Sequence, residues 1–218
     1  MIQPTHIDLA FPVRGDKLPR DHGYALYGAL SRALPEVHGA DWLGIQCIPG
    51  RLVGPETLDV TSGSFVRLRI PVDRIVTLLP LTGATLEIQG AAIHLGAPQV
   101  HVLKPVAALD AQLVVIRLTG GAGHPFSRAA FDERFAAEAN RQLSRIGVTG
   151  ELTLRGRRSL EVGGRRIIGH AVSVSGLSAE HSVILQVHGL GGKRTMGCGL
   201  FRPAQVKISI ARDVRSAS

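Results

Sequence analysis

A glycine-rich segment near the end of the chain carries the residues best suited to hold an anion. Within His188–Phe201, several glycines, among them Gly191 and Gly192, surround the pair Lys193 and Arg194. Glycine allows positive φ angles and a close approach of the backbone to a ligand. Successive free N–H groups beside a cation can hold a phosphate. We therefore predict that this loop grips a phosphate chain. The alternative is a glycine-rich hairpin with two solvated charges.

A second group of charges is a cluster of arginines around a predicted β-hairpin. Its members are Arg155, Arg157, Arg158, Arg165 and Arg166. A run of charge is usually a solvated face. In a chain with a surplus of positive charge we interpret it as a binding surface whose arginines contact the phosphates of a nucleic acid.

The composition indicates a basic globular protein. The chain has 218 residues, with 25 Lys and Arg against 17 Asp and Glu, a formal net charge of +8. Such a balance favours a polyanionic partner, either nucleic acid or an anionic membrane surface. No apolar run is long enough to span a bilayer, so we expect a nucleic-acid partner and no membrane.

Cysteine and histidine usage gives no sign of a metal or cofactor. Cys47 and Cys198 lie far apart without a CxxC partner, and the spacing of His170, His181 and His188 fits no common ligand pattern. We expect neither a metal nor a cofactor. Sparse cysteines and the absence of a signal-peptide pattern predict a cytoplasmic location.

Hydrophobic periodicity predicts the elements that must position these residues. In the first half we expect strands at 6–13, 42–48, 65–70, 85–88 and 92–95, and helices at 23–34 and 73–79, with Asp21 as the N-cap of the first helix. In the second half we expect strands at 109–118, 152–154, 166–174 and 200–208, and helices at 127–146 and 178–187, with Ser178 capping the last.

Each half therefore has the order strand–helix–strand–strand–helix–strand, which is the ferredoxin-like order. We predict an α+β protein with two such domains in tandem, residues 1–102 and 103–210. The glycine-rich loop precedes the last strand.

Three segments resemble a known family. They are Asp21–Arg32, His38–Ile45, and Val174–Leu177 leading into His188–Phe201. Together they are similar to the RAMP superfamily (RRM-like, ferredoxin-like folds), and more closely to the CRISPR RNA-processing endoribonucleases of Type I systems, in their myxobacterial-type subfamily. The glycine-rich loop indicates only the superfamily, and the first two segments narrow the resemblance to the processing nuclease.

The resemblance implies a reaction. A CRISPR precursor RNA is cut once in each repeat by attack of the upstream 2′-hydroxyl on the scissile phosphate, without a metal. The products are a 2′,3′-cyclic phosphate (or a 3′-phosphate) and a 5′-hydroxyl. Such an attack needs a base, an acid, and positive charge near the phosphorane.

The same resemblance places catalytic histidines in or just after the first helix, where His38 and His22 match. His38 is the first choice as general base or acid. His22, at the helix start, is a second acid–base group or a helix cap. Tyr27 stands where some relatives carry the histidine itself; it either contacts the phosphate or packs. Lys17 is the candidate cation in the turn before the helix, since relatives place their lysine variably.

Two other functions stay open at this level. One is a non-catalytic RAMP subunit that binds crRNA in an effector complex, and the other is a general RNA-binding protein. The expected partner is CRISPR repeat RNA or crRNA, with other effector subunits as further candidates. A monomer and a homodimer are equally compatible with the sequence.

Overall fold

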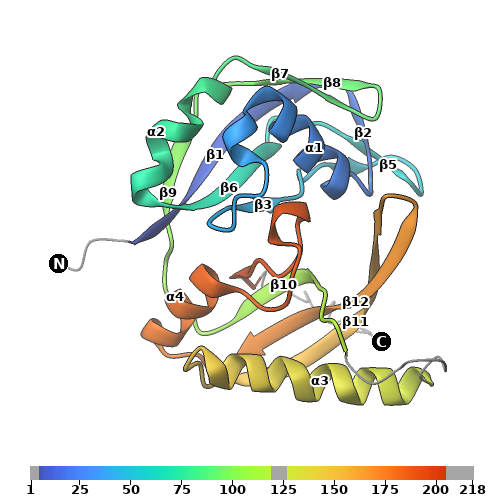
Figure 1. Cartoon of the computed structure of the whole chain (residues 1–218), viewed down its shortest axis with the longest axis vertical. Helices are drawn as coiled ribbons and strands as arrows, with labels where there is room; N and C mark the ends of the chain where they lie inside the picture. The colour runs from blue at the N-terminus through green and yellow to red at the C-terminus, as the bar shows by residue number, and fades with distance from the viewer. Residues whose placement is uncertain (1–4, 119–126, 205–218) are drawn as a thin grey trace, which may run out of the picture.

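The first half of the chain forms an antiparallel sheet covered by helices (Figure 1). The computed structural model describes residues 5–118 and 127–204. The elements of this half that build the repeat unit are β1 (His6–Gly15), α1 (Gly23–Ala33), β3 (Gly44–Gln46), β6 (Phe65–Pro71), α2 (Ile75–Leu78) and β9 (Gln99–Val102). The strands lie in the order β3-β6-β1-β9, which is the second, third, first and fourth strand of a ferredoxin-like unit.

The second half repeats this arrangement. Its elements are β10 (Leu109–Val114), α3 (Arg128–Arg145), β11 (Glu151–Val162), β12 (Arg165–Ser175), α4 (Ala179–His188) and β13 (Arg202–Pro203). The strand order β11-β12-β10-β13 is again second, third, first, fourth. The predicted tandem ferredoxin-like architecture is confirmed. The boundary expected after Val102 coincides with the end of β9, and the division into two domains stays a prediction.

Additional elements extend the first sheet. The hairpin β7 (Thr85–Ile88) and β8 (Ala91–Leu95) pairs with the far end of β1, and β2 (Lys17–Pro19), β5 (Thr57–Asp59) and β4 (Arg51–Leu52) form a small separate sheet. Four short 3₁₀ turns complete the described part: η1 (Pro35–Val37), η2 (Val72–Arg74), η3 (Leu79–Leu81) and η4 (Arg194–Met196). No helix in the described residues is both long and apolar enough to cross a membrane.

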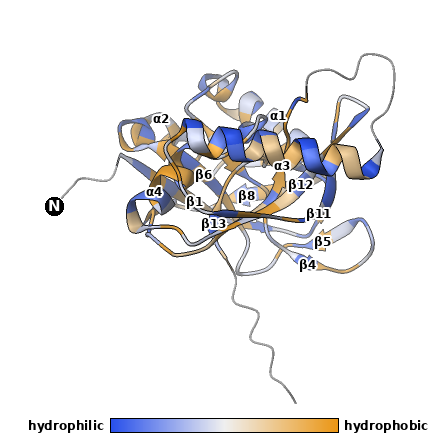
Figure 2. Cartoon of the chain, turned by 90° about the horizontal axis from the view of Figure 1, so that it is seen from below, coloured by the Kyte–Doolittle hydropathy of each residue, from blue (hydrophilic) through white to orange (hydrophobic). Residues whose placement is uncertain are grey.

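Helical periodicity explains which faces are buried. On α3 the buried residues are Phe135, Ala139 and Leu143, one per turn, because residues four apart share a face. Hydrophilic and hydrophobic segments accordingly alternate along this helix in Figure 2. Ser178 caps α4 as predicted, since its hydroxyl accepts a hydrogen bond from the His181 amide.

Several sequence-based boundaries were wrong. The hairpin strand expected at 152–154 runs from Glu151 to Val162, because its pairing with β12 continues through the arginines after a register shift between Leu154 and Gly156. The strand expected at 109–118 ends at Val114, and residues 205–208 of the last expected strand lie outside the described part. The predicted N-cap Asp21 is also wrong, since His22 occupies that position without a side-chain cap.

A buried arginine connects the two halves. Arg69 on β6 is 1% exposed and forms a two-bond ion pair with Asp8 on β1, at 2.8 and 3.0 Å. Its remaining N–H groups donate to the carbonyl oxygens of Gln186, at 2.8 Å, and Phe201, at 2.7 Å. The first carbonyl belongs to the last turn of α4, which leaves its carbonyls without intrahelical partners. Arg69 therefore holds both ends of the segment that contains the glycine-rich loop.

Candidate active site and RNA interface

The loop after α1 is held by a tyrosine of that helix. The Gly39 amide donates a hydrogen bond of 2.9 Å to the Tyr27 hydroxyl oxygen. The Tyr27 ring stacks on the His38 imidazole, with 6.1 Å between centroids and 14° between planes. His38 itself is exposed. Tyr27 thus fixes the position of an imidazole that stays open to solvent.

The glycine-rich loop faces this histidine-bearing loop. A cavity of about 300 Å³ is bordered on one side by Tyr27, residues 39–41 and Leu43, and on the other by residues 191–195. Segments about 150 residues apart in sequence therefore meet at one site. Lys193, half-buried with φ 61°, lines this cavity and brings an ammonium group near the histidine-bearing loop.

The amides of the glycine-rich loop do not form the predicted anion cradle. The Gly191 amide donates to the Gln142 side-chain oxygen at 2.8 Å, and the Gly192 amide donates to the Val115 carbonyl at 2.9 Å. A Cβ at Gly191 would lie 2.2 Å from that same carbonyl oxygen. Gly191 is therefore required for close packing, whereas a Cβ at Gly192 would meet nothing within 4 Å. Because both amides are bonded within the protein, the structure gives no support to the expectation that their N–H groups grip a phosphate.

The side chain of Arg194 is also hydrogen-bonded within the protein. Its guanidinium donates to the Val187 carbonyl in the last turn of α4 at 2.8 Å, and burial lowers its pKa. A cation at a helix C-terminus is favourable because the exposed carbonyls carry partial negative charge. Arg194 borders the cavity, but its guanidinium is hydrogen-bonded to the C-terminal end of α4. Lys193 is therefore the cation of this loop that is better placed to bind an anionic ligand.

His22 occupies a structural position. Its side chain is buried; Nδ1 lies 2.7 Å from the Pro19 carbonyl oxygen and Nε2 accepts a 2.9 Å hydrogen bond from the Ile48 amide. Because an amide can only donate, Nε2 carries no proton and Nδ1–H is the donor. Burial lowers the pKa of the imidazole. Both nitrogens are occupied, so this geometry leaves no atom for the acid–base role expected from the sequence.

Lys17 lies apart from the His38 loop. It is exposed on β2, within the small sheet β2-β5-β4, and does not border the cavity between the His38 loop and the glycine-rich loop. The structure thus gives the expected cationic role no support at Lys17, and Lys193 is the better-placed lysine.

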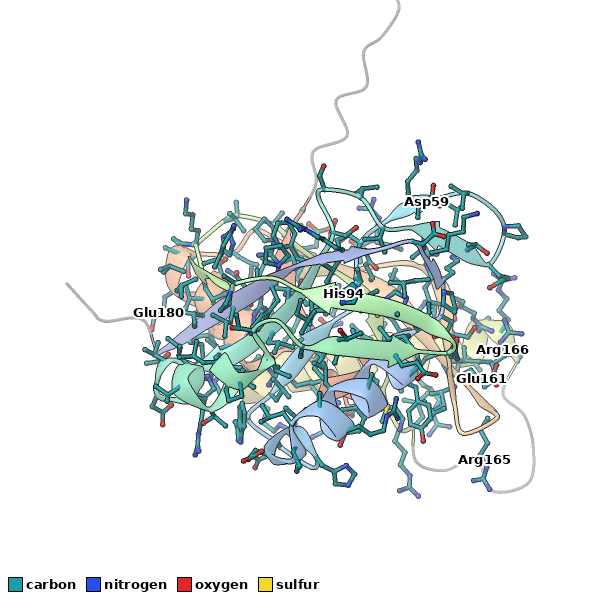
Figure 3. The ribbon with its side chains drawn as sticks, turned by 90° about the horizontal axis from the view of Figure 1, so that it is seen from above. Asp59, His94, Glu161, Arg165, Arg166 and Glu180 are labelled. Carbon is teal, nitrogen blue, oxygen red and sulfur yellow. The ribbon has the colours of Figure 1, made fainter. Side chains whose placement is uncertain are left out.

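The arginines of the β11–β12 hairpin differ in their surroundings. Arg157, Arg158 and Arg166 line a cleft of about 990 Å³ between the hairpin and the first half of the chain, and Arg202, which the sequence analysis missed, lines it too. Arg165, at the end of the two-glycine turn, projects into solvent in Figure 3. Arg155 is exposed and donates to the Ser173 hydroxyl at 3.3 Å. Arg202 stands outside any cluster of charge, so nothing in the local sequence indicates that it belongs to a binding surface.

Arg157 differs from its neighbours because it anchors the hairpin to α3. Its guanidinium pairs with Asp132 at 2.8 Å, donates to the Arg128 carbonyl, and lies over the Phe131 ring at 4.9 Å. The buried His170 imidazole contacts the same Asp132 carboxylate at 3.0 Å. Arg157 borders the cleft, but these contacts occupy its guanidinium, so its main role in the structure is to anchor the hairpin. Across residues 5–118 and 127–204, His, Cys, Asp and Glu side chains form no metal-binding group of three or more.

Comparisons with known proteins identify the family of the chain. The family model described as Cas6 Crispr matches residues 7–206. The chain is 43% identical over 197 residues to the CRISPR-associated endonuclease Cas6 of Myxococcus xanthus (strain DK1622), covering 90% of this chain and 81% of that protein.

Solved structures share the fold at low sequence identity. One, titled as a CRISPR associated protein Cas6, superposes with a TM-score of 0.65 at 11% identity, covering 92% of this chain and all of that one. Another, titled as a RAMP protein binding different RNA substrates, superposes with a TM-score of 0.66 at 15% identity, covering 91% of this chain and all of that one. With a family match over nearly its whole length and a relative this similar, the chain belongs to the Cas6 family.

Proposed function

We propose that this chain is a metal-independent endoribonuclease that cuts CRISPR precursor RNA within its repeats and so produces mature crRNA. Membership of the Cas6 family and 43% identity to a protein named as a CRISPR-associated endonuclease support the substrate class and the reaction type. The observation that carries the mechanism is His38: an exposed imidazole, stacked on Tyr27, whose neighbour Gly39 borders the same cavity as Lys193.

The reaction is an internal transesterification. The 2′-oxygen upstream of the scissile phosphate forms a bond to phosphorus while the bond from phosphorus to the 5′-oxygen breaks. The 2′-hydroxyl loses its proton to a base and the departing 5′-oxygen gains one from an acid. The products are a 2′,3′-cyclic phosphate and a 5′-hydroxyl. The nucleophile belongs to the substrate, so the protein needs to supply only proton transfer, orientation and charge.

Three residues take these roles. His38 performs one of the two proton transfers, since imidazole exchanges protons near neutral pH. Lys193 stabilises the negative charge that builds on the phosphorane oxygens. Tyr27 orients His38 through the ring stack and the Gly39 amide. His22 is left out because both of its nitrogens are engaged.

The arginine hairpin is the proposed RNA-binding surface. Arg155, Arg158, Arg165 and Arg166 are exposed on it, and the net charge of +8 adds long-range attraction. Phosphate contacts of this kind fix the position of the RNA without reading its sequence. They also make the affinity fall with salt, because each contact releases counterions.

Cleavage of the cognate repeat RNA in EDTA tests the mechanism. We expect one cut per repeat, and a loss of about 10²–10⁴-fold in single-turnover rate for His38→Ala with unchanged affinity. His101→Ala is the matched control, because His101 is exposed on β9, away from the His38 loop. Cleavage only with divalent ions, or full activity of His38→Ala, would contradict the proposal. Binding without cleavage by the wild type would favour the non-catalytic RAMP subunit.

Salt dependence tests the binding surface. Replacing both Arg158 and Arg166 by alanine is expected to reduce the slope of log affinity against log salt by about 2, one per phosphate contact. Arg157→Ala is the comparison, since that guanidinium is bound to α3; it should lower stability more than it changes the salt slope. An unchanged slope in the double variant would remove this part of the hairpin from the RNA site.

A further inference from the structure

The RNA-binding hairpin is fastened to the start of α1 by one carboxylate. The Glu161 amide, near the end of β11, donates a hydrogen bond of 2.9 Å to Asp21 Oδ2, across 140 residues of sequence. β11 is the outermost strand of its sheet, so the N–H groups on its outer edge have no strand partner. In Figure 3 Glu161 lies at the same end of the molecule as Arg165 and Arg166.

This contact lies beside an apolar junction that includes the glycine-rich loop. Leu160, the neighbour of Glu161, is buried in a small cluster with Cys198 and Met196. On the other side, a Cβ at Gly23 would lie 2.5 Å from the Met196 carbonyl oxygen, so α1 begins in direct contact with that loop. Hairpin, helix start and loop therefore meet at one place.

The junction connects directly to the candidate active site. Met196 is the last residue of η4, and Lys193, just before this turn, borders the cavity beside the His38 loop. The hairpin that would hold the RNA and the residues that would cut it are thus joined through one short turn and one helix start.

RNA affinity alone does not explain a carboxylate at this position. Asp21 borders the same cleft as Arg158 and Arg166. A negative charge there weakens the attraction of the cleft for phosphate. The Asp21 carboxylate instead accepts a hydrogen bond from the Glu161 backbone amide of the hairpin.

We propose that Asp21 is a positioning residue that sets the distance between the hairpin and the cutting site, and thereby selects which phosphate of the bound RNA is cleaved. The inference rests on the proposed nuclease function. It assigns Asp21 no contact with the reacting atoms. A hairpin free to shift would present neighbouring phosphates to His38, because adjacent phosphates differ by only one nucleotide step along the strand.

Two variants separate the hydrogen bond from the charge. Asp21→Ala and Asp21→Asn remove the same charge, but only asparagine keeps an acceptor oxygen for the Glu161 amide. For Asp21→Ala we expect about tenfold slower single-turnover cleavage at the normal site, new products at adjacent phosphates, and an affinity equal to or tighter than that of the wild type. Asp21→Asn should keep the single cleavage position and a rate within about threefold of the wild type, because an amide oxygen replaces the carboxylate as acceptor.

The outcomes that overturn the inference are distinct. Wild-type rate and cleavage position in Asp21→Ala would show that the contact does not position the RNA. Equal loss in both variants would assign the effect to charge. Amide hydrogen exchange at Glu161 reports the contact without any cleavage: we expect faster exchange in Asp21→Ala than in Asp21→Asn, and equal rates would refute the bond. A wild-type protein that never cuts repeat RNA, with a protected Glu161 amide, would instead overturn the proposed function and with it the selection of the phosphate.

Discussion

Replacing Arg69 by methionine should destabilise the whole protein, because this side chain is the buried connection between its two halves. The guanidinium is 1% exposed, pairs with Asp8 through two hydrogen bonds, and donates to two carbonyls of the second half. Methionine fills a similar volume but pairs with nothing. The variant leaves the Asp8 carboxylate, 7% exposed, without its cation.

The magnitude follows from these contacts. Removing one partner of a buried ion pair costs about 3–5 kcal/mol, because the other charge remains desolvated. For a chain of this size each kcal/mol lowers Tm by about 2–4 °C. We therefore expect Tm to fall by about 6–20 °C in thermal unfolding followed by circular dichroism. Cleavage should fall as well, since Arg69 also holds the Phe201 carbonyl at the end of the glycine-rich loop.

Two controls identify the cause. Arg51→Met breaks an ion pair with Asp59 of the same 2.8 Å length, but the Arg51 side chain is 74% exposed, so we expect a loss below about 1 kcal/mol. Asp8→Asn added to Arg69→Met removes the stranded charge and should recover part of the lost Tm. The reasoning is refuted if Arg69→Met lowers Tm no more than Arg51→Met, or if the second substitution recovers nothing.

Three further predictions concern residues around the candidate site. Tyr27→Phe removes the acceptor of the Gly39 amide and should slow single-turnover cleavage about tenfold while Tm changes by only a few degrees; an unchanged rate would exclude a positioning role. Gly23→Ala places a Cβ 2.5 Å from a backbone oxygen of the glycine-rich loop and should lower the free energy of unfolding by about 1–3 kcal/mol. Gly28→Ala is the control: its Cβ would lie 3.4 Å from the flexible tip of a side chain, so this variant should not destabilise the protein. Burial lowers the pKa of His22 below 6.5, so the unfolded state binds more protons than the folded state below that pH, and stability should fall as pH drops from 6.5 toward the folded-state pKa. Comparing Tm at pH 7.5 and 5.5 checks this, and His22→Gln should show a smaller difference than the wild type.

The fold was largely predictable because its signals are local. Apolar spacing predicted α1 and α3, a serine side chain predicted the start of α4, and the order of elements predicted the tandem architecture. Such patterns follow from the helical and strand periods themselves and need no knowledge of distant segments. The same local reasoning predicted that the first helix ends near residue 34, and the structure accordingly has His38 just after that helix.

Local patterns failed wherever the role of a residue depends on its partners. His22 and His38 lie in the same stretch of sequence, yet one is buried with both nitrogens engaged and the other is open to solvent. Arg157 and Arg158 are adjacent and both border the same cleft, yet the guanidinium of Arg157 is paired with a carboxylate of α3 while Arg158 is exposed.

The sequence by itself thus determined the elements, their order, the surplus of positive charge and the residue types available for chemistry. Tertiary structure alone decided that the amides of Gly191 and Gly192 are used internally, that Lys193 lies beside the His38 loop, and that Arg69 is buried. The physical reason is that the burial and hydrogen bonding of a polar group are set by chain segments far away in sequence. Those segments come together only when the two sheets pack.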